Sequence, residues 1–153
     1  GGRLPGGFFR LPNDTEYRTI DHTNDVCVGY IGNNTNYDKD IPLNLQRDAV
    51  RLFCKEHSIP NNMMQVENEY LHWMPILEDL LESEIDVIVM HSIYSLPDAR
   101  RRREYLINLA LKNNITMWFA NEEFCLSNES EKQKINTYLN FGHKQKGWLP
   151  WET

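Results

Sequence analysis

Short apolar runs that alternate with amphipathic helical stretches constrain the fold of this chain more than any other feature of its sequence. The expected strands are residues 26–31, 63–68, 86–90 and 115–120. Between and after them, apolar residues recur every three to four positions, which is the period of a helix with one buried face. The alternation predicts an α/β domain with an open, mostly parallel sheet of four to five strands and helices on both faces.

The run DVIVM at residues 86–90 is continuously apolar after its first residue and rich in β-branched side chains. This composition is typical of a strand that is covered on both faces. We therefore expect it at the centre of the sheet.

The first helix is expected from about Pro42, because proline fits a first helical turn. Leu45, Ala49, Leu52 and Phe53 recur at helical spacing and form its expected buried face.

Three further helices are predicted. One begins near Pro75, the next begins at Pro97 and Asp98, and the last follows the capping signals at residues 127–131. Gly142 is expected to end the last helix.

Length and charge limit the organisation and the partners. A chain of 153 residues fits one domain, which we place at residues 26–142. A Gly- and Pro-containing segment, 1–25, is expected to be a flexible arm or a cloning remnant, and 143–153 a tail.

A net charge of −6 argues against tight autonomous DNA binding, because DNA-binding domains normally carry a basic face.

Cysteine and histidine spacing gives no sign of a metal centre or a disulfide framework. Cys27, Cys54 and Cys125 are scattered and odd in number, so reduced core thiols are expected. The five histidines lack i,i+4 spacing, so each is expected on the surface or in a loop and no metal is predicted.

With no secretory signal and no apolar run of about 18 residues, the chain is expected in the cytoplasm, away from membranes.

In an α/β sheet, ligand sites lie at the carboxyl ends of the strands. After the first predicted strand, that position holds Gly32, Asn33, Asn34 and Thr35, which include no serine or cysteine. A phosphate-binding glycine motif is also missing there. No cofactor is predicted, and these strand ends make no recognisable catalytic set.

Residues 41–59, IPLNLQRDAVRLFCKEHSI, resemble the first helix of the serine recombinase (resolvase/invertase) catalytic domain, S-L-x-x-Q-x-x-A-L-x-x-[YF]-C-x-x-x-G-[IY]. The residues that fit are Leu43, Gln46, Ala49, Phe53, Cys54 and Ile59. Residues 28–31 resemble that family's first strand, 75–81 its R-P-x-L-x-x-L-L segment and 85–89 the strand before its D-R-L-[SG]-R motif. The resemblance spans about residues 26–127 and implies the resolvase-like fold and a setting of DNA recombination or mobile elements.

The same resemblance implies that the catalytic positions are degenerate. The family's Tyr-x-Arg-x-Ser aligns with residues 30–34, so Gly32 replaces an arginine and Asn34 the nucleophilic serine. Met74 replaces the arginine of R-P-x-L. Within the aligned D-R-L-[SG]-R motif, the exchanged positions are Tyr94, Ser95 and Asp98.

These exchanges predict a domain without strand-cleaving activity that acts through protein association, with itself or with an active recombinase. Two alternatives stay open. One is an active recombinase fragment with a rearranged site that uses Thr35 and the run Arg100, Arg101, Arg102 and Arg103. The other is a protein-interaction domain unrelated to DNA. The four arginines are otherwise expected to be a solvated face, or a weak site for DNA or an acidic partner.

Overall fold

The structure is a computed structural model that describes residues 22–32, 41–60, 63–67 and 73–145, with side chains up to Leu139. Its strands, helices and 3₁₀ turns (η) follow in the order β1 (Cys27–Gly32), α1 (Leu43–Glu56), β2 (Met64–Glu67), α2 (Pro75–Leu81), β3 (Val87–Met90), η2 (Ile93–Ser95), α3 (Arg100–Lys112), β4 (Thr116–Phe119), β5 (Phe124–Leu126), η3 (Glu129–Glu131) and α4 (Lys132–Gln145).

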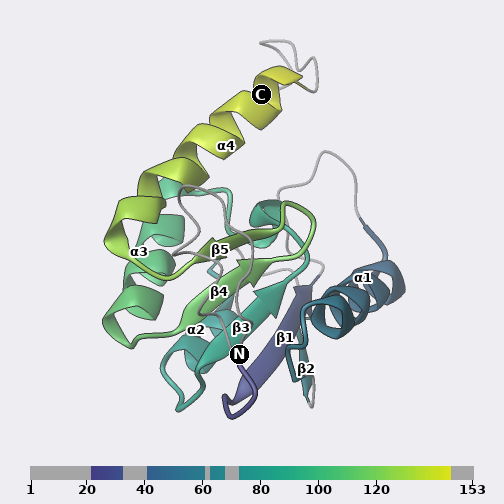
Figure 1. Cartoon of the computed structure of the whole chain (residues 1–153). Helices are drawn as coiled ribbons and strands as arrows, with labels where there is room; N and C mark the ends of the chain where they lie inside the picture. Colours follow the sequence, from purple (N-terminus) through teal and green to yellow (C-terminus); the bar gives the residue numbers. More distant parts are fainter. Residues whose placement is uncertain (1–21, 33–40, 61–62, 68–72, 146–153) are drawn as a thin grey trace, which may run out of the picture.

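The strands form one sheet in the order β2-β1-β3-β4-β5, in which β1 to β4 are parallel and β5 is antiparallel to β4 (Figure 1). The predicted α/β class and the central position of residues 86–90 are confirmed. The apolar pattern did not predict β5, because three residues after a tight turn are too short for a periodic signal. That turn includes Glu123, which has a left-handed φ of 51°.

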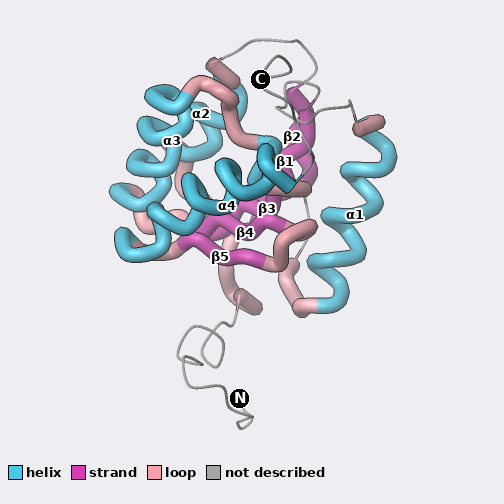
Figure 2. The backbone as a smooth tube through the Cα atoms, turned by 90° about the horizontal axis from the view of Figure 1, so that it is seen from above, coloured by secondary structure: helices cyan, strands magenta, loops and turns pink. Residues whose placement is uncertain are grey.

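Helices cover both faces of the sheet, as predicted (Figure 2). On one face, α1 packs its side chains with inward residues of β1, β3 and β4 in a cluster that contains Val50, Phe53 and Trp118. On the other face, α2, α3 and α4 share a larger cluster that contains Leu77, Leu106 and other buried side chains. The sheet is therefore a buried middle layer between one helix and three.

The buried face of α1 differs from the predicted one. Phe53 is buried, but Leu45 and Leu52 are 53% and 55% exposed. The residues that face the sheet are Gln46, Val50, Phe53 and Cys54. The prediction was wrong because two apolar stripes run along this helix, and periodicity does not say which one meets the sheet.

Truncating the adjacent residues Phe53 and Leu52 should therefore have very different effects on stability. Phe53→Ala is expected to lower the free energy of unfolding by about 3–5 kcal/mol, because it leaves a cavity in the core. Leu52→Ala should change it by about 0.5 kcal/mol or less, as for most exposed positions. Urea unfolding followed by circular dichroism measures both values, and equal losses would contradict the orientation of α1.

The ends of α3 and α4 also differ from the prediction. Pro97 and Asp98 do not start α3, which begins at Arg100 after the turn η2 and an extended Leu96. Gly142 does not end α4, which continues to Gln145. A glycine inside a helix costs only about 1 kcal/mol, so its presence does not fix a helix end.

The last residues before β1 belong to the folded domain. His22 is buried, and its Nε2 accepts a hydrogen bond of 3.1 Å from Nε1 of Trp118. Its Nδ1 lies 2.7 Å from the carboxylate of Asp25. This histidine lies in the loop before β1, as expected of a surface or loop position, but it is buried there. Of the expected arm, residues 1–25, only 22–25 are among the described residues.

The three cysteines are free, and Cys27 and Cys54 are buried. Burial raises the pKa of each of these two thiols from 9.0 to about 11, with nearby Asp25 adding to the shift at Cys27.

The folded state favours the neutral form of these thiols, whereas the unfolded chain releases their protons near pH 9. Their contribution to the free energy of unfolding is therefore complete below pH 9 and is lost as the pH rises toward 11. The free energy of unfolding is therefore expected to fall across this alkaline range. Cys54→Ala should make the fall shallower, as urea titrations at a series of pH values would measure. The same slope in the variant and the parent chain would contradict this linkage.

Candidate functional site

The carboxyl ends of four parallel strands meet at one edge of the sheet, where the sequence predicts a site. The pairing of Gly32 with Glu67 and of Tyr30 with Met90 places the ends of β1, β2 and β3 side by side. Phe119 at the end of β4 is paired with Met90. The chemistry available at this edge therefore depends on the side chains at these ends and in the loops after them.

Gln46 of α1 connects both ends of the loop between β1 and α1. Its side chain is fully buried, and its Nε2 donates to the carbonyl oxygens of Gly32 at 3.0 Å and Ile41 at 2.8 Å. Its Oε1 accepts from the amide of Gly32 at 3.3 Å. The sequence showed Gln46 only as a motif match. A polar residue four positions before the buried Val50 is the signal that could have revealed this role.

Replacing Gln46 with leucine should destabilise the domain, because the change keeps the volume but leaves buried backbone groups without partners. We expect a loss of about 2–4 kcal/mol from the free energy of unfolding. Gln65→Leu, on the edge strand β2, is the matched control and should cost about 0.5 kcal/mol or less. A Gln46→Leu variant as stable as the control in urea would show that these bonds are dispensable.

Glu67 at the end of β2 joins β1 to the start of α2. Its Oε1 accepts a 2.6 Å hydrogen bond from the hydroxyl of the buried Tyr30 and a 3.2 Å bond from the amide of Leu77. Its Oε2 accepts from the amide of Ile76 at 3.0 Å. Burial, with the hydrogen bond and the charge of Glu67 adding to it, raises the pKa of Tyr30 far above its ordinary value. The carboxylate thus caps α2 and keeps the phenol neutral.

A third set of polar contacts links the ends of β3 and β4. Ser92 is buried, and its hydroxyl donates to Oε2 of Glu122 at 2.5 Å and accepts from the amide of Tyr94 at 3.1 Å. Oε1 of Glu122 accepts from the amide of Ile93 at 2.9 Å. Burial lowers the pKa of the neighbouring His91, and the charge of Glu122 opposes this shift. Ser92 is a structural hydroxyl rather than an exposed nucleophile.

Three of the positions where the resembled family has catalytic groups are occupied by buried side chains. Met74 and Ser95 are each 1% exposed, and Tyr94 is 6% exposed. Met74 and Tyr94 belong to the core cluster on the α2 and α3 face. Met74 also has a left-handed backbone, with φ at 50°. These side chains point into the protein, where no phosphate group can reach them.

The remaining exchanged positions contribute no cationic group either. Gly32 is buried at the end of β1 with its backbone held by Gln46. Asp98 is exposed, and its carbonyl oxygen accepts from Nη1 of Arg103 at 3.0 Å. Asn34 and Thr35 lie outside the described residues.

Two of the four consecutive arginines hold helices together. Arg102 pairs with Glu78 of α2 and donates from Nε to the carbonyl oxygen of Trp73 at 2.8 Å. Arg103 is 8% exposed and donates to the carbonyl oxygen of Pro97 at 3.2 Å and to Oδ1 of Asn136 on α4 at 3.3 Å. Burial lowers the pKa of Arg103, although nearby Asp98 opposes the shift.

The other two arginines are exposed. Arg100 forms a 3.0 Å ion pair with Glu104, one turn along α3. Within the described part of the chain, no ion pair or hydrogen bond engages the Arg101 side chain, which leaves it as the member of the run best able to meet an external anion. The four guanidinium groups therefore do not converge on one point.

No group of three or more histidine, cysteine, aspartate or glutamate side chains is placed to hold a metal ion, as far as the described residues extend. Likewise, none of the described helices is long and apolar enough to cross a membrane.

Several solved structures are similar to this one, and two of them are described here. The N-terminal catalytic domain of TP901-1 integrase aligns with a TM-score of 0.57 and 14% identity over 79% of this chain and 97% of that chain. A resolvase family site-specific recombinase from Streptococcus pneumoniae aligns with a TM-score of 0.53 and 8% identity over 80% of this chain and 89% of the other. These likenesses confirm the resolvase-like fold implied by the motifs. No protein-family model and no curated protein sequence matches the chain.

Proposed function

We propose that this chain is a serine-recombinase-like domain that has kept the fold, has lost DNA strand cleavage, and acts by associating with a protein partner in DNA recombination. The fold likeness to recombinase domains supports the class. The observation that carries the loss of cleavage is the burial of Met74, Tyr94 and Ser95 at positions where the resembled motifs have catalytic groups. Such side chains cannot stabilise charge on a phosphate.

The chemistry implied by the resemblance needs a serine hydroxyl to attack a DNA phosphate and arginines to stabilise the charge on its oxygens. An asparagine at position 34 is no nucleophile. Loss of a single preorganised donor typically slows such reactions by about 10²–10³. Several simultaneous losses at one edge of the sheet should leave no measurable cleavage.

A covalent-adduct assay tests this proposal directly. The protein is incubated with supercoiled DNA, nicked DNA and a pool of random-sequence duplexes, with an active serine recombinase on its own site as the positive control. We expect no protein–DNA adduct on a denaturing gel. Asn34→Ser should also give none, because it restores a hydroxyl without the arginines. An adduct that disappears in Thr35→Ala would falsify the inactive proposal and identify a rearranged nucleophile.

The active alternative, with Thr35 and the arginine run, receives little support from the geometry. Arg102 and Arg103 are committed to contacts with Glu78 and with backbone carbonyl groups, and Arg100 is paired with Glu104. One arginine of the run, Arg101, has neither kind of contact among the described residues.

Weak DNA contact and a role unrelated to DNA can be distinguished by the salt dependence of binding. If Arg101 contacts a phosphate, Arg101→Ala should lower the slope of log affinity against log salt by about 1. Lys55→Ala, on α1 at the opposite face of the sheet, is the control and should leave the slope unchanged. Fluorescence anisotropy with a labelled duplex measures it. Absence of salt-dependent binding would favour the DNA-independent interaction domain.

The proposed partner is a second copy of this chain or an active recombinase, in the cytoplasm. Two observations support this association: the fold is similar to recombinase domains, and the side chains buried at the motif positions cannot take part in DNA cleavage. Sedimentation velocity of the protein alone, over a range of concentrations, and of its mixture with an active recombinase separates these two partners. A single monomer boundary under every condition would count against association.

A further inference from the structure

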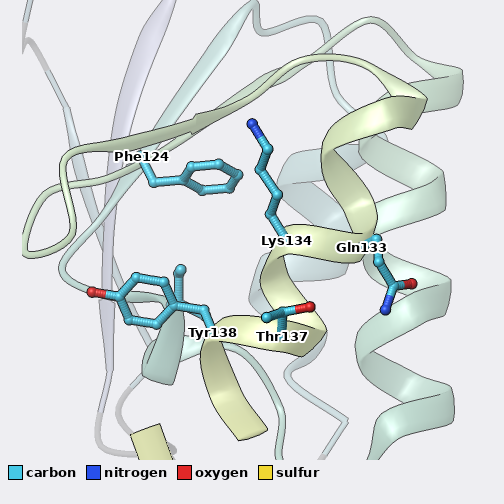
Figure 3. Close-up of a pocket in the computed structure, with 6 residues that line it drawn as sticks. Phe124, Gln133, Lys134, Thr137 and Tyr138 are labelled. Atoms are coloured by element: carbon cyan, nitrogen blue, oxygen red, sulfur yellow. The ribbon is translucent and has the colours of Figure 1, made fainter. Parts of the chain in front are cut away.

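An apolar groove of about 400 Å³ lies between β5, η2 and the first half of α4 (Figure 3). Its lining comes from Ile93, Phe124, Gln133, Lys134, Thr137 and Tyr138. Ile93 is 1% exposed, so the groove has a solid apolar base. The Phe124 ring stacks on Phe119 of β4, with ring centroids 6.2 Å apart, which holds one wall in place. Tyr138 is 43% exposed and leaves aromatic surface open beside α4.

The size of the groove fits a small molecule better than a folded protein. Ligand pockets in proteins usually enclose about 300–1,000 Å³. A stable interface between two proteins takes about 20–30 residues from each side, whereas six residues line this groove. A compound with one or two rings is therefore the occupant that the dimensions favour.

Of the six lining residues, Lys134 alone is charged. No carboxylate among the described residues forms an ion pair with its ammonium group. Glu131, three residues before it, is buried and accepts hydrogen bonds from the amides of Ser127 and Asn128. Thr137 lies one turn after Lys134 and adds a hydroxyl to the lining. An anion at this end of the groove would meet a cation and a neutral donor.

Glu122 sets the direction in which an anionic ligand can lie. Its Oε1 accepts a hydrogen bond of 2.9 Å from the amide of Ile93, so this carboxylate stands beside the base of the groove. Burial raises the pKa of Tyr138, and the negative charge of Glu122 adds to the shift. A ligand anion is therefore repelled from the Tyr138 end and attracted to Lys134, which leaves its apolar part over Ile93.

We propose that this groove binds a small aromatic carboxylate, with the carboxylate beside the Lys134 ammonium group and the ring between Phe124 and Tyr138. Figure 3 shows the Phe124 ring facing the Lys134 side chain, with the Tyr138 ring beside them. Aromatic pairs favour offset-stacked or edge-to-face contacts, which two neighbouring rings offer to a third. One lysine balances the single charge of a carboxylate, whereas a phosphate ester carries nearly two. This inference goes beyond the proposed function and does not rest on it.

Titration of the ¹⁵N-labelled full-length chain with 2-naphthoate, followed by ¹H–¹⁵N NMR, tests the inference. A ligand of this size should bind with a dissociation constant of about 1 mM or lower. We expect saturable shifts of the Phe124 and Tyr138 amides, whereas the amides of α1, on the opposite face of the sheet, should not move. No saturable shift up to the solubility of the ligand, or shifts confined to other surfaces, would overturn the inference.

A neutral ligand and a pair of lysine variants isolate the contribution of charge. The alcohol 2-naphthalenemethanol has the same rings, and it should bind the parent chain about three- to fivefold more weakly than 2-naphthoate, as expected for an exposed ion pair. Lys134→Met should remove this preference for the carboxylate. Lys132→Met is the matched control and should keep it, because Lys132 also lies on α4 but pairs with Glu129, outside the lining.

A pair of tyrosine variants tests the aromatic wall. Tyr138→Ser should weaken 2-naphthoate binding about tenfold through the loss of one aromatic contact and its buried surface. Tyr105→Ser is the control, because Tyr105 of α3 is 46% exposed and lies outside the groove lining. Circular dichroism checks that each variant is folded. The same carboxylate preference in both lysine variants, or the same affinity in both tyrosine variants, would contradict the proposed site.

Discussion

The carboxyl edge of the sheet depends on buried polar side chains that bind backbone groups. Parallel strands and helix starts leave amides and carbonyls without partners at this edge, and such groups are costly when they are buried. Gln46 satisfies the end of β1 and the approach to α1, and Glu67 satisfies the first amides of α2. After β3 and β4, Glu122 accepts hydrogen bonds from the amide of Ile93 and the hydroxyl of Ser92. These contacts connect the described ends of the strands to the starts of the helices that follow.

These contacts also restrict the chemistry at this edge. A catalytic group must present a free donor, acceptor or charge to its substrate, whereas Glu67 and Ser92 direct theirs to the protein itself. Arg103 is likewise used to connect the start of α3 to α4. The proposed association with a protein partner requires no reactive group at this edge.

Much of the fold was predictable from local sequence signals. The β-branched run at Val87–Met90 is central because it is apolar on both of its sides. Long periodic stretches located all four helices. The errors concern features that a local pattern does not specify: which of two stripes on α1 is buried, where α3 begins, and whether Gly142 ends α4. Leu52 and Phe53 have similar hydrophobicity, and only their contacts distinguish them.

The sequence by itself determined the order of β1 to β4 and of the helices between and after them, and with it the class of fold, since each depends on residue identity and spacing along the chain. The tertiary structure decided where those residues point. It buried Met74 and Tyr94 in the core, directed the arginines toward different partners, and opened a groove between Phe124 and Tyr138. These outcomes depend on contacts between residues far apart in the sequence, which no local pattern contains.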